Sequence, residues 1–329
     1  MTIKKGENDL MAKPTFEEAF QDNQVPANKT GYWSYTWHMV KVNKGCYGLL
    51  APFMIFFIIC TVIPVCMSLP MSFMNFNMIQ SPKWVGLSNF YTLFLNDSVF
   101  LIAVRNTLIF AIFTGPFAYF LTFFVAWLIN EMNPFLKTFF TFVFYAPSMT
   151  TSVYVTWQLI LSGDQYGYLN AVLLDLGFVS KPIQWLTDTT YILGVCIVVQ
   201  LWMSMGAGFL AIRAGFQTID KTMYEAGAIE GIKNRWQELF KITIPSMGPQ
   251  LLFAAVNQIA GSFTVGAVGQ MLVGLPSTDY AAHTIMNHAT DYGSVRYEMG
   301  YASAICFVLF LAMLLANKGV NSLLGKFID

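Results

Sequence analysis

The chain has 329 residues with 18 basic and 18 acidic side chains, so its formal net charge is zero. Apolar residues make up 56% of it and charged residues only 11%, against about 25% charged in an ordinary soluble domain. This composition excludes a water-soluble enzyme, and the balanced charge gives no electrostatic footprint for nucleic acid. The five cysteines lack metal-ligand or redox spacing, so we expect small packing residues.

Charged residues are missing from six long blocks of the chain. A helix that crosses the hydrocarbon layer of a membrane needs about 20 apolar residues, and each block holds one such segment. The pattern predicts an all-α integral membrane protein with six transmembrane helices. Their expected ranges are 46–69, 103–130, 137–161, 189–211, 247–272 and 299–317. An alternative count places two spans in the first block, although its second half is polar.

The distribution of Lys and Arg orients these spans. With both termini in the cytoplasm, only Lys83, Arg105, Lys181 and Arg296 lie outside, which leaves 14 of the 18 basic residues inside. The positive-inside rule therefore predicts an N-in, C-in topology. Residues 1–45 are expected to be a polar cytoplasmic lead that ends in interfacial aromatic residues. The first residues lack the apolar core of a signal peptide, so we expect no cleavage.

The longest expected cytoplasmic segment, 213–245, predicts two short helices. Asp220 or Thr222 is suited to capping a first helix that runs to about Glu230. Gly231 follows at a position where a helix end often requires positive φ.

The second helix of this segment has its own signals. Asn234, with Gln237 three residues later, is typical of a variant capping box, and Pro245 marks the return to the membrane. In the first helix, small residues at 226–228 leave the backbone bare, so another surface can approach it closely. The segment therefore predicts a projecting helical hairpin.

The hairpin motif resembles the EAA loop of bacterial ABC importer permeases. It reads Glu225-Ala226-Gly227-x-x-Glu230-Gly231 and then Trp236-Gln237-x-x-Phe240-x-Ile242-Thr243-x-Pro245. Further segments resemble the carbohydrate-uptake branch, of the maltose and glycerol-3-phosphate type. They are Val85-Gly86-Leu87-x-Asn89-Phe90, Asn106-Thr107, Pro182-Ile183-x-Trp185-Leu186 and Gly300-Tyr301-Ala302-Ser303-Ala304. The sequence departs from the family at Gly274-Leu275-Pro276, where a fuller Gly-Gly-Gly-Pro turn is usual.

The resemblance implies a type I ABC importer permease fold. It divides the chain into the lead at 1–45, a first transmembrane helix with an external loop at 46–100, a core permease domain at 101–318 and a cytoplasmic tail at 319–329. The implied partners are a second permease, two ATPase subunits, an extracytoplasmic solute-binding protein and membrane lipid. This chain has no phosphate-binding loop, so ATP and Mg are expected in the ATPase subunits and no cofactor in this chain.

The implied contact with an ATPase subunit is the first helix of the loop, with the second helix packing behind it. The residues expected to couple the two subunits are Glu225, Ala226, Gly227, Glu230, Gly231, Trp236, Phe240 and Pro245. A plain solvated helical hairpin is the alternative. His283 and His288 lie in an expected external loop, where we predict a solvated pair and no metal site.

Polar and small residues within three of the spans are candidates for a solute pathway. Sugars need amide and hydroxyl partners and an aromatic face. The candidates are Trp157, Gln158, Gln200, Ser204, Asn257, Gln258 and Ser262. The alternative is helix packing, in which small residues and amides join neighbouring helices.

Two other functional classes, secondary transporters and membrane enzymes, differ from this sequence in their polar residues. A secondary transporter driven by an ion gradient usually keeps ionisable residues near the membrane midplane, and these spans carry none there. A membrane enzyme needs an acid, base or nucleophile cluster, and no catalytic residue is predicted. An importer permease is the function that the sequence favours.

Overall fold

The computed structural model describes Trp37 and residues 39–328, with side chains described as far as residue 322. Most of the expected N-terminal lead lies outside the described residues. The chain divides into two compact units, Met1–Cys66 and Met67–Asp329, each of which is described by itself.

The first transmembrane segment is one continuous helical stretch. It comprises α3 (Lys44–Phe57), the π-helical η1 (Ile58–Val62) and α4 (Ile63–Met71). No residue of these three elements is buried within the chain, and a stretch that is apolar on every side is typical of a membrane span. A turn and a short strand follow at once, so the alternative of two spans in this block is wrong.

The segment before the long helix α6 forms a small folded cap. The strands β1 (Met74–Asn75) and β2 (Lys83–Trp84) pair antiparallel, and α5 (Ser88–Tyr91) and the π-helical η2 (Thr92–Asn96) follow. The Asn89 amide donates to the carbonyl oxygens of Ser72 and Met74, both at 2.9 Å. Asn89 therefore ties α5 to β1.

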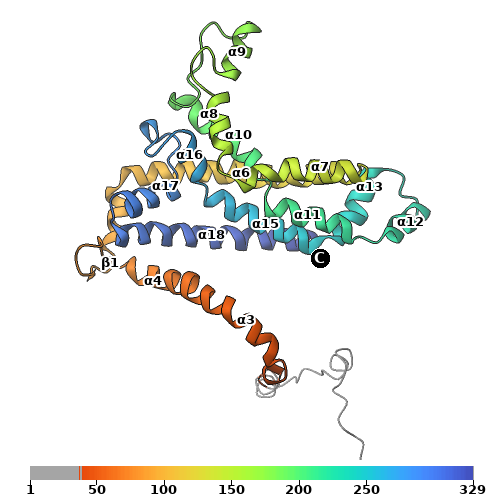
Figure 1. The fold of residues 1–329 in the computed structure, drawn as a ribbon, viewed down its shortest axis with the longest axis horizontal. Helices are drawn as coiled ribbons and strands as arrows, with labels where there is room; N and C mark the ends of the chain where they lie inside the picture. Colours follow the sequence, from red (N-terminus) through yellow and green to blue (C-terminus); the bar gives the residue numbers. More distant parts are fainter. Residues whose placement is uncertain (1–36, 38, 329) are drawn as a thin grey trace, which may run out of the picture. The chain divides into compact units, whose positions relative to one another are not determined.

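A helical bundle forms the centre of the second unit. The long helices α6 (Ser98–Asn130) and α18 (Met299–Ile328) both pack against α15 (Gly248–Phe263), which also contacts α11 (Ala207–Thr218) (Figure 1). Gly208 allows the close approach of α11, because a Cβ atom there would lie 3.4 Å from the Ala254 Cα atom. Small residues thus bring these helices into backbone contact.

Three expected spans are interrupted helices. The range 189–211 contains α10 (Thr189–Met203) and the start of α11, which are separated at Ser204–Gly206. The range 137–161 contains α7 (Pro134–Tyr145), the 3-10 turn η3 (Ala146–Met149) and α8 (Val153–Ile160), because Pro147 interrupts the helix. The range 247–272 contains α15 and α16 (Ala267–Leu272), which are separated at Thr264–Gly266. Single continuous helices over these three ranges were the wrong prediction.

Short elements connect the long helices. They are α9 (Tyr168–Asp175), α12 (Lys221–Ile229), α13 (Arg235–Glu238), the π-helical η4 (Leu239–Thr243), α14 (Ile244–Ser246), the 3-10 turn η5 (Thr278–Tyr280), α17 (Ile285–Thr290) and the π-helical η6 (Asp291–Val295). The Asn170 side chain holds the loop after α9, since its Oδ1 accepts from the Ile183 amide at 3.1 Å and from Trp185 Nε1 at 2.9 Å.

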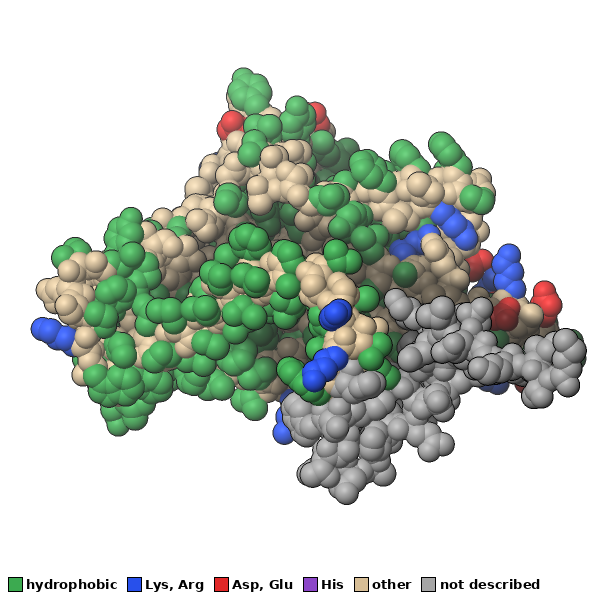
Figure 2. Space-filling model, turned by 60° about the horizontal axis from the view of Figure 1, so that its bottom comes forward, with side chains coloured by type: hydrophobic (Ala, Val, Ile, Leu, Met, Phe, Trp, Pro, Cys, Tyr) green, Lys and Arg blue, Asp and Glu red, His purple; other side chains and the backbone are tan. Residues whose placement is uncertain are grey.

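Four helices of the described residues are long and apolar enough to cross a membrane. They are Lys44–Met71, Ser98–Asn130, Thr189–Thr218 and Met299–Ser322, and a fifth span results if Arg235–Ser246 and Gly248–Phe263, bent by 83°, are counted together. Hydrophobic side chains cover much of the visible face in Figure 2. Six spans and the N-in, C-in orientation stay predictions.

The free cysteines divide into two groups. Cys196 is buried in the core between α6, α8 and α10. The other four, at positions 46, 60, 66 and 306, are exposed within this chain. The prediction of packing cysteines is therefore confirmed for Cys196 alone.

Candidate coupling loop and polar pocket

The first helix of the loop, α12, has the ends that the sequence predicts. The Asp220 carboxylate accepts a hydrogen bond from the Thr222 amide at 3.0 Å, which caps the helix and lowers the pKa of Asp220. Gly231 has φ +92°, a left-handed conformation in which glycine ends a helix without strain.

Gly227 lies on the inner side of α12. It is buried, and a Cβ atom there would lie 2.6 Å from Ile242 Cδ1 and 3.1 Å from Ile232 Cδ1. The central residue of the small-residue patch therefore serves close packing within the hairpin and does not face outward. Tyr224 joins the same contact through its hydroxyl, 3.0 Å from Thr243 Oγ1.

The outer side of α12 is open. Glu225, Ala226, Ala228 and Glu230 are exposed, and Ile229 is 88% exposed. Among the described residues, Glu225 and Glu230 form no ion pair. This face presents two carboxylates, two small residues and one large apolar side chain.

The second helix runs through α13, η4 and α14 and bends sharply into α15. Asn234 Oδ1 accepts from the Gln237 amide at 2.8 Å, and Gln237 Oε1 accepts from the Lys233 amide at 3.0 Å. This reciprocal pair is the predicted variant capping box. Pro245 lies in α14, two residues before the bend.

Trp236 and Phe240 lie on a different side of this helix from the one expected. Trp236 packs on Trp127 of α6 with ring centroids 5.2 Å apart, and Phe240 stacks on Trp236 at 6.4 Å. Both line an apolar groove of about 600 Å³ along α6. They therefore do not pack behind α12, where they were expected. The residues that pack against α12 are Ile242 and Thr243.

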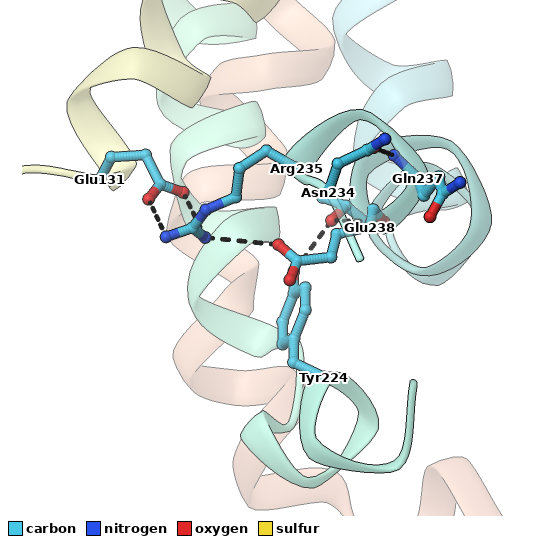
Figure 3. Close-up of polar contacts among 7 residues, drawn as sticks. Glu131, Tyr224, Asn234, Arg235, Gln237 and Glu238 are labelled. Atoms are coloured by element: carbon cyan, nitrogen blue, oxygen red, sulfur yellow. Dashed lines mark hydrogen bonds and ion pairs between the residues drawn. The ribbon is translucent and has the colours of Figure 1, made fainter. Parts of the chain in front are cut away.

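An ion-pair cluster connects the loop to the end of α6. The Arg235 guanidinium lies between two carboxylates, 3.0 Å from Glu131 and 3.3 Å from Glu238 (Figure 3). The sequence does not predict this cluster, because Glu131 and Arg235 are far apart in the chain. The only hint of this ion pair in the sequence is that Glu131 and Arg235 carry opposite charges and lie at ends of expected helices.

Five of the seven pathway candidates line one pocket. This polar pocket has a volume of about 210 Å³ and lies where α10 gives way to α11, beside α15 and α6. The candidates in it are Gln200, Ser204, Asn257, Gln258 and Ser262. The other lining residues are Thr114, Met203, Gly206, Ala207, Gly208 and Gly261.

The side chains in the polar pocket differ in their hydrogen-bond partners within the chain. Gln258 Nε2 donates to Thr122 Oγ1 at 3.2 Å and to the Ser204 carbonyl oxygen at 3.3 Å, so it joins three helical segments. Asn257 and Ser262 donate only to carbonyl oxygens of their own helix, at 2.9 and 2.8 Å. Gln258 thus has a packing role, and Asn257 is not tied to another helix.

Trp157 and Gln158 lie outside the polar pocket. The Trp157 ring meets the Trp202 ring edge to face, with centroids 5.2 Å apart, and lines a separate apolar pocket. Gln158 Nε2 donates to the Met271 carbonyl oxygen at 2.7 Å. This bond caps the end of α16, so the two residues do not join the other candidates.

The two expected solvated histidines are buried. His283 is 1% exposed and His288 is 2% exposed. His283 Nε2 lies 3.1 Å from His288 Nδ1, and His288 Nε2 lies 2.9 Å from Asp97 Oδ2, which also accepts from the Tyr301 hydroxyl at 2.8 Å. The prediction was wrong because α6, α17 and α18 pack around this loop.

The Asp97 carboxylate determines which ring nitrogens donate in the hydrogen-bonded series His283–His288–Asp97. Asp97 only accepts, so His288 donates through Nε2 and accepts from His283 at Nδ1. His283 Nδ1 is then an acceptor, and it is the ring atom without a hydrogen-bond partner. Burial, followed by the electrostatic interaction with His288, lowers the pKa of His283 to about 4. Burial alone raises the pKa of Asp97, but hydrogen bonds from the Phe100 amide, Tyr301 and His288 lower it overall.

No group of three or more His, Cys, Asp or Glu side chains in the described part of the chain has metal-binding geometry. The carboxylate that is hydrogen-bonded to the histidine pair, that of Asp97, also accepts from the Tyr301 hydroxyl. The pair is a structural link between α6, α17 and α18.

Known proteins resemble this chain over most of its length. Residues 118–324 match the family described as binding-protein-dependent transport system inner membrane component. The probable ABC transporter permease protein YesP of Bacillus subtilis (strain 168) is 29% identical over 279 residues, covering 82% of this chain and 87% of YesP. The arabinooligosaccharides transport system permease protein AraP of the same strain is 26% identical over 283 residues, covering 85% of this chain and 88% of AraP.

The fold has a solved counterpart. It is a chain of a bacterial alginate ABC transporter, solved in complex with an alginate pentasaccharide-bound periplasmic protein. The two chains superpose with a TM-score of 0.72 at 21% identity, covering 89% of this chain and 98% of the other. The family match includes the loop hairpin and every lining residue of the polar pocket except Thr114. This chain belongs to the family of binding-protein-dependent transport system inner membrane components, the permease subunits of ABC transporters.

Proposed function

We propose that this chain forms one half of the solute pathway of an ATP-driven importer, with a second permease as the other half. Two ATPase subunits would bind ATP and Mg, and an extracytoplasmic binding protein would deliver the solute. The family membership supports the transport role. The lack of a phosphate-binding loop in the sequence supports a division of labour in which hydrolysis occurs on other subunits.

The exposed outer face of α12 is the observation that carries the coupling proposal. A capped helix of nine residues, Lys221–Ile229, projects from the bundle and is backed by Ile242 and Thr243 of the second helix. Glu225, Ala226 and Ile229 on its outer face make none of these backing contacts. A cleft in an ATPase subunit that receives this face would bury Ile229 and pair with the carboxylates.

Charge reversal at Glu225 tests the contact directly. We expect Glu225→Lys to leave the chain inserted but to reduce co-purification of the ATPase or its binding-protein-stimulated hydrolysis by about tenfold or more. Asp175→Lys, on exposed α9, is the matched reversal at a site expected on the other side of the membrane. It should retain the ATPase. Wild-type retention, stimulation and uptake in Glu225→Lys would refute the coupling role.

For the solute we propose a sugar or oligosaccharide. The polar pocket offers amide and hydroxyl groups from α10 and α15, which is the lining that a carbohydrate needs. The relatives support this class, since one is named for arabinooligosaccharides and the solved structure carries an alginate pentasaccharide on its periplasmic protein. Selectivity would be shared with the binding protein.

Proteoliposomes that contain the assembled importer separate the proposal from a secondary transporter. Uptake of labelled oligosaccharide should require internal ATP and external binding protein, and it should persist when ionophores collapse proton and sodium gradients. Uptake that needs an ion gradient and continues without ATP would establish the alternative. Uptake of amino acids in place of oligosaccharides, under the same ATP requirement, would overturn only the solute class.

A further inference from the structure

A pocket between α7 and α11 contains a buried cation that lacks an anionic partner. Arg213 of α11 is 5% exposed, and its Nε atom has no hydrogen-bond partner. Its only hydrogen bond to a side chain is a long one, from Nη1 to Asn130 Oδ1 at 3.4 Å, and no ion pair involves it within the described residues. A buried guanidinium is costly unless an anion compensates its charge.

The pocket beside Arg213 has room for such an anion. It has a volume of about 590 Å³, and Lys137 in the first turn of α7 contributes a second cation to its lining. Lys137 also forms no ion pair within the part of the chain that the structure describes. The nearby acids Glu131 and Glu238 both bind Arg235. Two cations therefore face one pocket whose lining contains no carboxylate.

The rest of the lining indicates the kind of anion. Thr138, Thr141 and Tyr145 line the pocket along α7, while Phe142 and Leu210 add apolar surface. Along α7, a row of exposed aromatic rings spaced by four and three residues leads from the start of this helix to Phe142 in the pocket lining. Phe135 is 78%, Phe139 51% and Phe142 68% exposed. A charged head with an attached apolar chain matches this combination better than a small soluble ion does.

The position of the site along the helices agrees with the depth of lipid headgroups in a membrane. Lys137 lies in the first turn of α7, just after the turn that follows α6, and Arg213 lies five residues before the end of α11 at Thr218. Five helical residues correspond to about 7.5 Å of depth. The bias of basic residues predicts this end to be cytoplasmic, where membranes carry anionic lipids that attract Lys and Arg.

We propose that this pocket binds the phosphate group of an anionic phospholipid, with Arg213 and Lys137 holding the phosphate and the aromatic row of α7 contacting an acyl chain. The lipid supplies the negative charge that the chain itself does not place beside Arg213. Nothing in this assignment depends on which solute the importer carries.

The test uses the assembled importer in detergent, titrated with phosphatidylglycerol and followed by native mass spectrometry. Phosphatidylcholine and inorganic phosphate are the comparison ligands. We expect selective binding of phosphatidylglycerol and a rise in melting temperature that phosphate alone does not reproduce. Arg213→Gln and Lys137→Gln should each weaken this binding by about fivefold, the effect of one basic residue near an anionic headgroup. Lys318 is an exposed cation of α18 that lines none of the pockets described, so Lys318→Gln should bind as the wild type does.

Three results would overturn the assignment. Unchanged affinity in both pocket variants would place any bound lipid elsewhere. Equal stabilisation by inorganic phosphate would identify a free anion as the occupant. Absence of selective phosphatidylglycerol binding in the wild type would mean that another subunit neutralises Arg213. If Arg213→Gln fails to assemble, Lys137→Gln decides the test, because Lys137 is only half-buried.

Discussion

Gly227 shows how a single small residue can have a packing role inside a projecting loop. We expect Gly227→Leu to disorder the hairpin, because the new side chain would overlap Ile242 and Ile232. Overpacking of this kind costs about 1–3 kcal/mol. Limited proteolysis of the segment 213–245 would measure the loss of order.

Ala228→Leu is the matched control, since Ala228 is exposed on the same helix. Its hairpin should stay resistant to protease, while the added bulk on the outer face should release the ATPase. A protease-resistant hairpin in Gly227→Leu would contradict the packing assigned to this glycine.

Gln258 and Asn257 separate the packing role of the polar pocket from its pathway role. Gln258 bonds to other helical segments, whereas Asn257 bonds only within its own helix. Gln258→Leu should therefore lower stability by about 1 kcal/mol, and Asn257→Leu should not. Thermal melting of the importer checks this difference.

Uptake by the same two variants tests the pathway. If the pocket contacts solute, both variants should slow transport per assembled complex, because both amides line it. Normal transport by Asn257→Leu, with a purely structural loss in Gln258→Leu, would leave the pocket as a helix-packing feature alone.

His283 predicts a pH dependence of stability. The pKa of this buried histidine is about 4 in the folded chain and 6.5 when unfolded. The unfolded state therefore binds a proton at higher pH than the folded state does, so the stabilisation present above pH 6.5 declines as the pH falls toward 4. The titratable and charged groups that face His283 are His288, Asp97, Asp291 and Arg296.

Melting temperatures at pH 7.5 and pH 5 measure this effect. The wild type should melt at a lower temperature at pH 5, and His283→Gln should show a smaller difference between the two pH values. An equal difference in the variant would assign the dependence to another group. Asp97 does not contribute in this window, because its lowered pKa lies below the ordinary value of 3.8.

At the scale of elements, Arg235 connects the second helix of the loop to the end of α6. Its contacts with Glu131 and Glu238 are exposed, so each is worth at most about 1 kcal/mol. We expect Arg235→Glu to lower ATPase stimulation without unfolding the chain, and Glu131→Arg in the same chain to recover part of it. No recovery in the double variant would show that the two side chains act separately.

Breaks in the helices position the polar pocket. Ser204–Gly206 separates α10 from α11, and Thr264–Gly266 separates α15 from α16. Irregular backbone at membrane depth is tolerated where it is buried in protein or lines a cavity. The polar pocket lies at the first of these breaks, which explains why its lining contains a backbone turn as well as side chains.

At the scale of the whole molecule, the topology is the prediction with the clearest test. In a background without the five native cysteines, Asp175→Cys should react with an impermeant maleimide in intact cells. Lys233→Cys should react only after permeabilisation. Both positions are exposed, so accessibility within the chain does not decide the result. The reverse pattern would invert the orientation derived from the basic residues.

Local signals in the sequence predicted much of the coupling loop. Asp220, Gly231 and Asn234 have the expected capping or turn geometry, because caps depend on a few neighbouring residues. The directions of Gly227, Trp236 and Phe240 were not predictable in this way. They depend on Ile242 and Trp127, which belong to other elements that the sequence pattern does not bring together.

The sequence by itself determined that this chain is a helical membrane protein with a projecting hairpin, since charge-free blocks and cap residues act over short distances. Only the tertiary structure decided that three expected spans are interrupted, that five pathway candidates share a pocket and that His283 is buried. These outcomes depend on contacts between helices that are distant in the chain. The physical reason is that burial and pairing of a polar side chain are set by its neighbours in space, whereas helix ends are set by neighbours in sequence.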